Sequence, residues 1–338
     1  MALYLLPMSV YDLFIPLFAI FFNTVERYRK ILIIRPGALG DTLMLLPCLR
    51  ALSQTHRIVV AGRRPGIDFL GHYVHTCFDM DRSPWYRLFL ARPAAEGLPG
   101  NPSDRVICFL ADPDGTIQNN LETYYPQAKT FLFPSLPGPH QGMHVAEYVC
   151  QCLVKARVAL NPKKVLHDAT EIPVLGPSPS AFRDHLVIHP GSGDKKKNYS
   201  LPFWVKLMEE LGKFYQRAPL HMKVLLGPAE AKQRPFFQEL VCAQGWTISF
   251  TPSSDALLHL LRHTLLFIGH DSGITHLAAM AGAATIALFK ASDPRLWRPL
   301  GPRVRLLQPE EDEKKFKAQV IREIEGFIAS PHAAPSTT

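Results

Sequence analysis

The feature that most constrains the fold is a unit that occurs three times: a short apolar run, then a glycine-rich turn, then a helical pattern of apolar residues. Short apolar runs bounded by glycine or proline are typical of buried strands in a parallel sheet. The three turns are residues 35–41 (RPGALGD), 189–200 (HPGSGDKKKNYS) and 269–276 (GHDSGITH). Because strands alternate with helices, the chain is predicted to be α/β.

The predicted elements fall into two groups, and the 338 residues suit two domains of about 150 residues each. Strands are expected at 31–34, 57–61, 106–110 and 129–133, and then at 186–188, 222–226, 247–250, 265–268 and 285–289. Helices are expected at 42–52, 144–158, 202–214, 257–262, 275–281 and 314–328. We therefore expect a Rossmann-like N-terminal domain over 31–160, a linker over 161–183, a Rossmann-like C-terminal domain over 184–308, a terminal helix over 309–330 and a disordered tail over 331–338.

Residues 1–30 are an apolar and basic N-terminal extension. Residues 1–22 are strongly apolar but contain Pro7, Asp12 and Pro16, and a basic cluster follows at 27–30. An interfacial membrane anchor and a helix packed on the protein's own surface fit this pattern about equally. The prolines and the aspartate disfavour a membrane-spanning helix, and the absence of basic residues before the apolar run disfavours a signal peptide.

Charge and cysteine usage restrict the partners and the compartment. A net charge of +8 indicates anionic partners, but the sequence has no basic stripe interleaved with aromatic residues, so nucleic acid is not expected. The six cysteines are scattered without a C-x-x-C pair, which favours reduced thiols in a cytoplasmic protein over a zinc site or disulfides.

The first turn carries a candidate catalytic base. In parallel α/β sheets, ligands bind beyond the carboxyl ends of the strands, where these turns lie. Gly37 and Gly40 permit close backbone approach, and Asp41 stands at the start of the next helix. Its carboxylate can remove a proton from a substrate or simply cap its helix, and both interpretations remain open here. The spacing G-x-x-G does not match the dinucleotide fingerprint.

The other two turns are suited to a phosphorylated ligand. Ser192 and Gly193 offer a hydroxyl and a backbone N–H to an anion, and Lys197 is the best placed of three lysines to neutralise it. Ser272 and Gly273 place N–H groups at a helix N-terminus, which suits a diphosphate. The third turn also contains Asp271, whose carboxylate can accept hydrogen bonds from sugar hydroxyls or from the turn's own backbone. It contains His276, which can contact a phosphate or pack within the protein.

Three blocks, 31–52, 186–211 and 265–303, together resemble the ADP-heptose:lipopolysaccharide heptosyltransferases, glycosyltransferase family 9. The resemblance implies the GT-B fold, in which two Rossmann-like domains face a central cleft. It implies that Asp41 of the G-D pair is the catalytic base and that Lys197 contacts the donor. The remaining implied substrate-binding residues are Gly40, Ser192, Gly193, Asp271, Ser272, Gly273, Thr275 and His276, with a looser match at Glu230 for the ribose.

The sequence departs from the family pattern at several positions. Tyr199 and Ser200 replace the usual Trp-Pro after Lys197, and residues 109–115 read FLADPDG where the family has D-x-Q-G. His144 and Glu147 are faintly similar to the family's H-x-x-[DE] helix. These differences leave the acceptor side less defined than the donor side.

The resemblance implies inverting transfer of a heptose or related sugar from a nucleotide sugar, ADP-heptose in the first place, to a lipopolysaccharide-core-type or other glycan acceptor. It implies no required cofactor and no bound metal, with stimulation by a divalent cation left open. A lipid-linked acceptor and an anionic membrane surface are the expected partners, and the expected location is the cytoplasm, at the inner face of the plasma membrane. The alternatives are a GT-B nucleotide-sugar epimerase or hydrolase and a non-catalytic nucleotide-sugar-binding or membrane scaffold protein.

Overall fold

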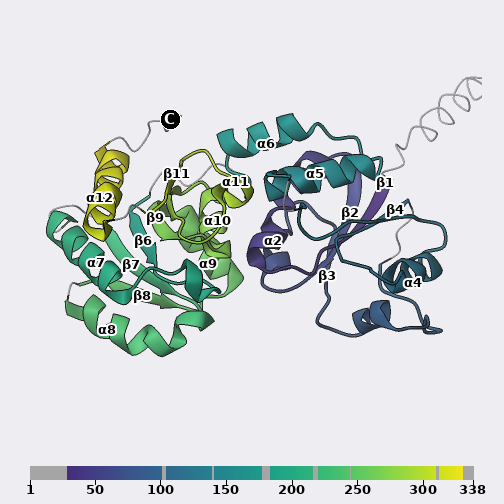
Figure 1. The fold of residues 1–338 in the computed structure, drawn as a ribbon, viewed down its shortest axis with the longest axis horizontal. Coiled ribbons are helices and arrows are strands. Elements are labelled where there is room, and N and C mark those ends of the chain that lie inside the picture. Colours follow the sequence, from purple (N-terminus) through teal and green to yellow (C-terminus); the bar gives the residue numbers. More distant parts are fainter. Residues whose placement is uncertain are drawn as a thin grey trace, which may run out of the picture.

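The computed structural model describes residues 29–100, 104–138, 141–176, 183–215, 220–243, 245–309 and 312–329. Two sheets, each covered by helices, lie side by side in these residues (Figure 1). The expectations for residues 1–28 and for the tail at 331–338 lie outside the described residues. No helix within the described ranges is long and apolar enough to cross a bilayer.

The N-terminal sheet has five strands in the order β3-β2-β1-β4-β5, and all its neighbouring strands are parallel. Its strands are β1 (Arg29–Ile34), β2 (His56–Gly62), β3 (Thr76–Asp79), β4 (Arg105–Cys108) and β5 (Lys129–Leu132). Its helices are α2 (Leu39–Leu43), α3 (Leu46–Leu52), α4 (Thr116–Tyr124), α5 (Val145–Lys155) and α6 (Pro162–Glu171), with single turns η1 (Gly66–Phe69) and η2 (Trp85–Phe89).

The C-terminal sheet has six parallel strands in the order β11-β10-β9-β6-β7-β8. Its strands are β6 (His185–His189), β7 (His221–Leu226), β8 (Thr247–Phe250), β9 (Thr264–His270), β10 (Ala284–Leu288) and β11 (Val304–Leu307). Its helices are α7 (Leu201–Tyr215), α8 (Arg234–Ala243), α9 (Ser254–Arg262), α10 (Gly273–Met280), α11 (Pro294–Trp297) and α12 (Glu313–Ala329), with single turns η3 (Lys195–Lys197) and η4 (Pro228–Gln233).

Two local predictions need correction. The helix expected at 42–52 is two helices, α2 and α3, and Pro47 stands in the first turn of α3. Proline has no N–H to continue the hydrogen-bond ladder of a preceding helix, so it favours a new start. The segment 161–183, expected to be a linker, contains helix α6, which begins at a proline after the capping residue Asn161.

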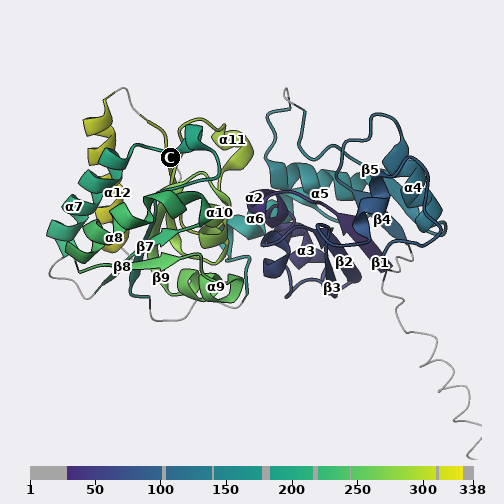
Figure 2. The same cartoon turned by 90° about the horizontal axis from the view of Figure 1, so that it is seen from below.

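The two halves share part of their apolar core. One buried cluster contains Leu43 and Leu46 of the N-terminal half together with Leu277 and Met280 of α10. Helices α2 and α10 pack against each other, and both views show them between the two sheets (Figure 2). Each helix follows the carboxyl end of a strand, β1 and β9, so the ligand-binding edges of the two sheets face each other.

Candidate active site

The starts of helices α2 and α10 touch, and this close approach requires glycine at position 273. A Cβ added at Gly273 would lie 2.8 Å from Leu39 Cβ and 2.9 Å from Gly40 N. A Cβ added at Gly40 would lie 3.7 Å from His276 Cδ2. The first and third turns of the sequence are therefore in direct contact.

We expect Gly273→Ala to lower the free energy of unfolding and the rate of any reaction at this site. Overpacking costs about 1–3 kcal/mol, which exceeds the roughly 1 kcal/mol that alanine gains over glycine in a helix. Gly193→Ala is the matched control, because a Cβ there meets nothing within 4 Å. Urea unfolding of both variants tests this, and a Gly273→Ala variant as stable as wild type would contradict the contact.

The Asp41 carboxylate caps its own helix. Its Oδ2 accepts a hydrogen bond of 3.0 Å from Ala38 N, and the side chain remains half-buried. The Asp41 side chain crosses the turn beside Gly37. A Cβ at Gly37 would lie 2.3 Å from Asp41 Cβ, so only glycine leaves room for the carboxylate there. The capping role is thus observed, while a role as base stays a prediction.

Arg35 fixes the backbone of this turn, a role that the sequence patterns did not indicate. Its side chain is buried, its Nε donates to Asp41 O at 2.9 Å and its Nη1 donates to Ser135 O at 3.0 Å. The guanidinium also lies 4.9 Å from the centre of the Phe109 ring. Burial lowers the pKa of Arg35, opposed by the negative charge of Asp41. Arg35 therefore holds the Asp41 backbone in place.

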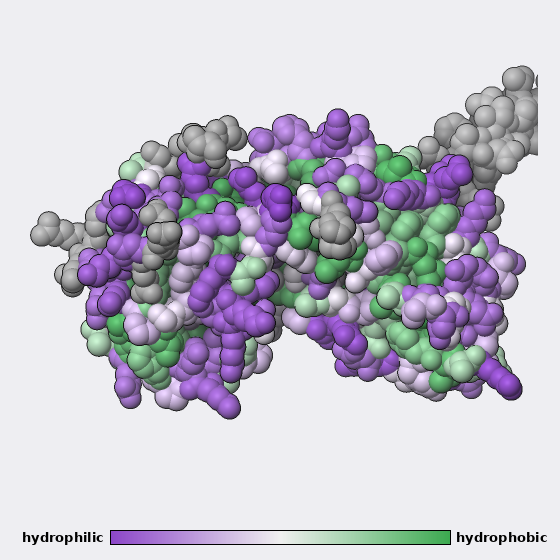
Figure 3. Space-filling model, viewed as in Figure 1, coloured by the Kyte–Doolittle hydropathy of each residue, from purple (hydrophilic) through white to green (hydrophobic). Residues whose placement is uncertain are grey.

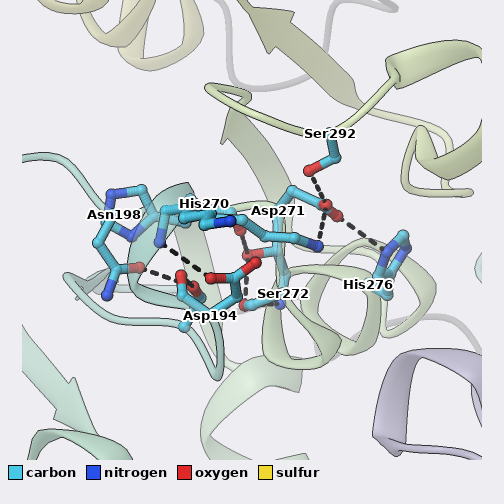
Figure 4. A network of polar contacts seen from close by, with 11 residues as sticks. Asp194, Asn198, His270, Asp271, Ser272, His276 and Ser292 are labelled. Carbon is cyan, nitrogen blue, oxygen red and sulfur yellow. Dashed lines mark hydrogen bonds and ion pairs between the residues drawn. The ribbon is translucent and has the colours of Figure 1, made fainter.

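Asp271 is the centre of a polar network in the C-terminal half (Figure 4). Lys197 Nζ lies 2.7 Å from Asp271 Oδ2, which also accepts a hydrogen bond from Ser292 Oγ. His276 Nε2 lies 3.5 Å from Asp271 Oδ1. Burial by itself raises the pKa of Asp271, but the contacts with His276, Lys197 and Ser292 outweigh it and lower the pKa to about 2.

The network positions Lys197 rather than leaving it as a solvated loop residue. Asp271 is only 3% exposed, whereas the Lys197 side chain is 29% exposed. An ammonium group has three N–H donors, so Lys197 can keep its bond to Asp271 and still face an anion. Ser292, which follows β10, was not identified from the sequence because it is far from both turns along the chain.

The hydroxyls at the start of α10 hold the turn itself. Ser272 Oγ accepts a hydrogen bond of 3.4 Å from Thr275 N, and Thr275 Oγ1 donates to His270 O. The buried Thr275 side chain thus ties the helix to the end of β9. The groups suited to an anion here are the first backbone N–H groups of the helix, at Gly273 and Ile274.

Side chains of the second turn, like those of the third, form hydrogen bonds within their own turn. Ser192 Oγ donates to Asp194 O at 2.8 Å and lies 2.6 Å from Asn198 Oδ1. Glu230, which is buried, accepts a hydrogen bond of 2.8 Å from Gly227 N. A Cβ at Gly191 would lie 1.8 Å from Glu230 Oε1, so the carboxylate packs directly against this turn. The structure therefore brings Glu230 to the glycine-rich loop.

Tyr199 stands at the position where the family has tryptophan, and its ring stacks on His270. The ring centres are 5.6 Å apart, and Tyr199 N donates to His270 Nε2 at 2.8 Å. Burial lowers the pKa of His270 to about 3, so its imidazole is neutral at pH 7 and can accept this bond. His270 was not among the predicted site residues.

His144 connects the two halves of the molecule. Its Nδ1 accepts a hydrogen bond from Ala146 N at the start of α5, and its Nε2 lies 2.9 Å from Arg298 O in the other half. With one nitrogen accepting and the other donating, the ring is neutral. Burial lowers the pKa of His144 to about 4, opposed by the hydrogen bond to Arg298.

We expect this contact to make stability depend on pH. An unfolded histidine protonates near pH 6.5, whereas His144 stays neutral in the folded protein down to about pH 4. The unfolded chain binds more protons in this window, so the free energy of unfolding falls as the pH is lowered through it. In urea unfolding at pH 7 and pH 5, His144→Asn, which can still cap α5, should lose less stability than wild type. Equal losses would contradict the role of His144.

Within the described residues, no group of three or more His, Cys, Asp or Glu side chains is placed to hold a metal ion. The structure gathers Lys197, Asp271, Ser272, Gly273, Thr275 and His276 around the start of α10, with Gly40 in contact and Asp41 on the adjoining helix. Ser192, Gly193 and Glu230 form the second loop of the same half.

A sequence model of the family described as glycosyltransferase family 9 (heptosyltransferase) matches residues 153–324, which is half of the chain. The chain belongs to glycosyltransferase family 9. It is a glycosyltransferase, and the predicted family is confirmed. No curated protein matches the chain.

Solved structures share the fold of this family 9 chain. A family 9 glycosyl transferase from Veillonella parvula is 13% identical, with a TM-score of 0.63 over 90% of this chain and 98% of that one. Heptosyltransferase WaaC from E. coli, solved with ADP, is 14% identical, with a TM-score of 0.61 over 89% and 99% of the two chains. The E. coli ADP-heptose lps heptosyltransferase II is 16% identical, with a TM-score of 0.60 over 90% and 100%. The predicted GT-B fold is confirmed.

The family match covers the two halves of the site unequally. Lys197, Glu230 and the turn at 269–276 lie inside the matched segment, whereas Gly40 and Asp41 lie before it. The assignment of Asp41 therefore depends on its place opposite α10, and it is tested separately below.

Proposed function

We propose that this family 9 glycosyltransferase moves a heptose or a closely related sugar from ADP-heptose to a lipopolysaccharide-core-type glycan, with inversion at the anomeric carbon. The observation that carries the proposal is the contact of the two turns: the α10 N-terminus, which follows the Asp271 partner of Lys197, stands against the helix that bears Asp41. A similar structure supports the choice of donor, since WaaC was solved with ADP-2-deoxy-2-fluoro heptose at 12% identity and a TM-score of 0.58.

In this proposal the C-terminal half holds the donor diphosphate. The ammonium of Lys197 and the N–H groups at the start of α10 are positive and already fixed in place by Asp271 and Ser272. Groups fixed before the reaction stabilise the charge that develops on the leaving ADP without reorganising. Glu230, beside the glycine-rich loop, is proposed to accept hydrogen bonds from the ribose.

Asp41 is proposed to act on the acceptor. Its carboxylate removes the proton from an acceptor hydroxyl while that oxygen forms a bond to the anomeric carbon. The bond between that carbon and the diphosphate oxygen breaks, and ADP leaves with the electron pair. A single displacement needs only one base, and it inverts the configuration at the anomeric carbon.

No cofactor is needed in this proposal because Lys197 and the helix N-terminus supply the positive charge. Transfer is therefore expected to persist after treatment with a chelator. Loss of transfer in chelator, restored by a divalent cation, would contradict this part of the proposal. A modest stimulation by added cation would be consistent with it, since a cation can also screen the diphosphate.

A panel of nucleotides tests the donor. We expect ADP and ADP-heptose to raise the thermal unfolding temperature, because a ligand at 100 times its dissociation constant stabilises the folded state by about 2.7 kcal/mol. UDP, GDP and their sugars at the same concentration serve as matched controls. Protection by UDP-sugars but not by ADP compounds would overturn the proposed donor.

A further inference from the structure

Two faces of the short helix η2 are apolar, although only one of them is buried. Trp85 and Leu88 point into the core of the N-terminal half, with exposed fractions of 1% and 0%. Tyr86 and Phe89 are 56% and 54% exposed. Residues three apart stand in line on a 3₁₀ helix, so each pair forms one face. Leu90, 36% exposed, extends the outer face. We call Tyr86, Phe89 and Leu90 the η2 patch.

The η2 patch is held firmly in its exposed position. Asn120 of α4 is buried, and its Nδ2 donates to Leu88 O at 3.0 Å and to Leu90 O at 2.8 Å. Arg87 Nη1 donates to Gly97 O at 3.2 Å, and Arg87 also pairs with Glu96. These contacts fix the backbone on both sides of Phe89. Helix η2 therefore presents two aromatic side chains to solvent from a backbone that hydrogen bonds hold in place.

Arginines flank the patch on both sides along the chain. The Arg82 side chain is 78% exposed, and its Nε lies 3.6 Å from Asp79 Oδ2. Arg64 Nε lies at the same distance from this oxygen, so the two arginines share one carboxylate. Arg92 is also exposed and has no ion pair among the described residues. Two nearby exposed acids are paired, Asp81 with Arg63 and Glu96 with Arg87. Glu122 of α4 is exposed and has no ion pair among the described residues. The surface around the patch thus offers positive charge.

The patch lies on the half of the molecule that bears Asp41. It follows β3, and Asp41 follows β1, so both come after the carboxyl ends of strands in the same sheet. Figure 3 shows green, apolar side chains at the lower right of the N-terminal half, where Figure 1 shows this part of the chain in dark blue. In Figure 1, helix α2, which bears Asp41, lies on the side of the N-terminal half that faces the C-terminal half, whereas the patch lies away from it, where η2 packs on α4.

We propose that the η2 patch inserts into the interface of an anionic lipid bilayer, with Arg82 and Arg92 on the lipid headgroups. Exposed aromatic side chains flanked by basic residues suit the boundary between headgroups and acyl chains. Three half-exposed side chains offer only about 300 Å² of surface, whereas a stable protein interface needs about 800 Å² from each partner. The area favours a membrane over a second protein. This inference rests on the proposed lipopolysaccharide-core-type acceptor, whose lipid part would lie in the same membrane.

Vesicle sedimentation tests the proposal with the full chain. It needs no nucleotide sugar, so its result does not depend on whether the protein transfers a sugar. Wild type should bind phosphatidylcholine vesicles that contain phosphatidylglycerol better than pure phosphatidylcholine vesicles. Tyr86→Ser with Phe89→Ser should weaken this binding about tenfold or more, since two aromatic contacts with the interface are lost. Phe236→Ser is the matched control, because Phe236 is 40% exposed on α8 in the other half. Unchanged binding of the double variant, or no binding by wild type, would overturn the proposal.

A second readout does not depend on total affinity or on the double variant. The tryptophan introduced by Phe89→Trp should be quenched by lipids brominated in their acyl chains, whereas the one introduced by Phe236→Trp should not. Arg82→Gln with Arg92→Gln should remove most of the preference for anionic vesicles. Equal quenching at the two positions would overturn the proposal. The proposal would also be overturned if the wild type were a dimer and Phe89→Ser dissociated it, because the patch would then be an interface between copies of the chain.

Discussion

Asp41→Asn is expected to lower kcat by about 10²–10⁴-fold while leaving the free energy of unfolding almost unchanged. Asparagine has a side-chain oxygen that can still accept the hydrogen bond from Ala38 N, so the helix cap is kept. It cannot take a proton from an acceptor hydroxyl. This substitution therefore separates the observed capping role of the Asp41 carboxylate from its proposed role as a base.

Asp41→Ala is the companion variant. It removes the base and the cap together, so it should lose the same activity and in addition about 1 kcal/mol of stability. Steady-state transfer, urea unfolding and ADP binding by calorimetry measure the three quantities. ADP binding should be retained in both variants, since Asp41 is proposed to act on the acceptor and not on the nucleotide. An active Asp41→Asn enzyme would show that the carboxylate only caps α2.

Lys197→Met is expected to lower kcat/KM for the donor by about 10²–10³-fold, the usual effect of removing one fixed group that stabilises developing charge. The substitution also removes the 2.7 Å partner of Asp271. Lys197 is among the contacts that lower the Asp271 pKa to about 2, so this pKa should rise in the variant.

Lys195→Met is the matched control for Lys197→Met, because Lys195 lies in the same turn η3 but is exposed. It should leave kcat/KM within about twofold of wild type, as expected for a solvated surface charge. If both variants lost activity equally, the effect would come from the net charge of the loop. The specific position of Lys197 would then carry no role.

The sequence was most informative where strands are buried. The apolar runs that predicted β1, β6 and β9 are largely inaccessible to solvent. The strands missed, β3 and β11, are four-residue strands at the edges of their sheets. An edge strand buries fewer side chains, so its hydrophobic pattern is weaker. The other two edge strands, β5 and β8, were nevertheless predicted, so position at an edge does not by itself prevent prediction.

The glycine-rich turns predicted which segments meet but not how their side chains are used. Ser192 and Thr275 were expected to face a ligand, yet their hydroxyls donate to backbone carbonyls of their own turns. Arg35 Nη1 donates to Ser135 O, 100 positions along the chain, and Ser292 reaches back to Asp271. Single-sequence patterns report spacing within one segment, and such contacts join segments that only the fold brings together.

The buried apolar cluster that contains Leu43 of the N-terminal half and Leu277 of the C-terminal half makes the two sheets depend on each other energetically. Separating the halves would expose this cluster to water, so neither half is expected to melt alone. Calorimetry should show one transition instead of two. Nucleotide that binds the C-terminal half, as proposed, should then also slow proteolysis of the N-terminal half.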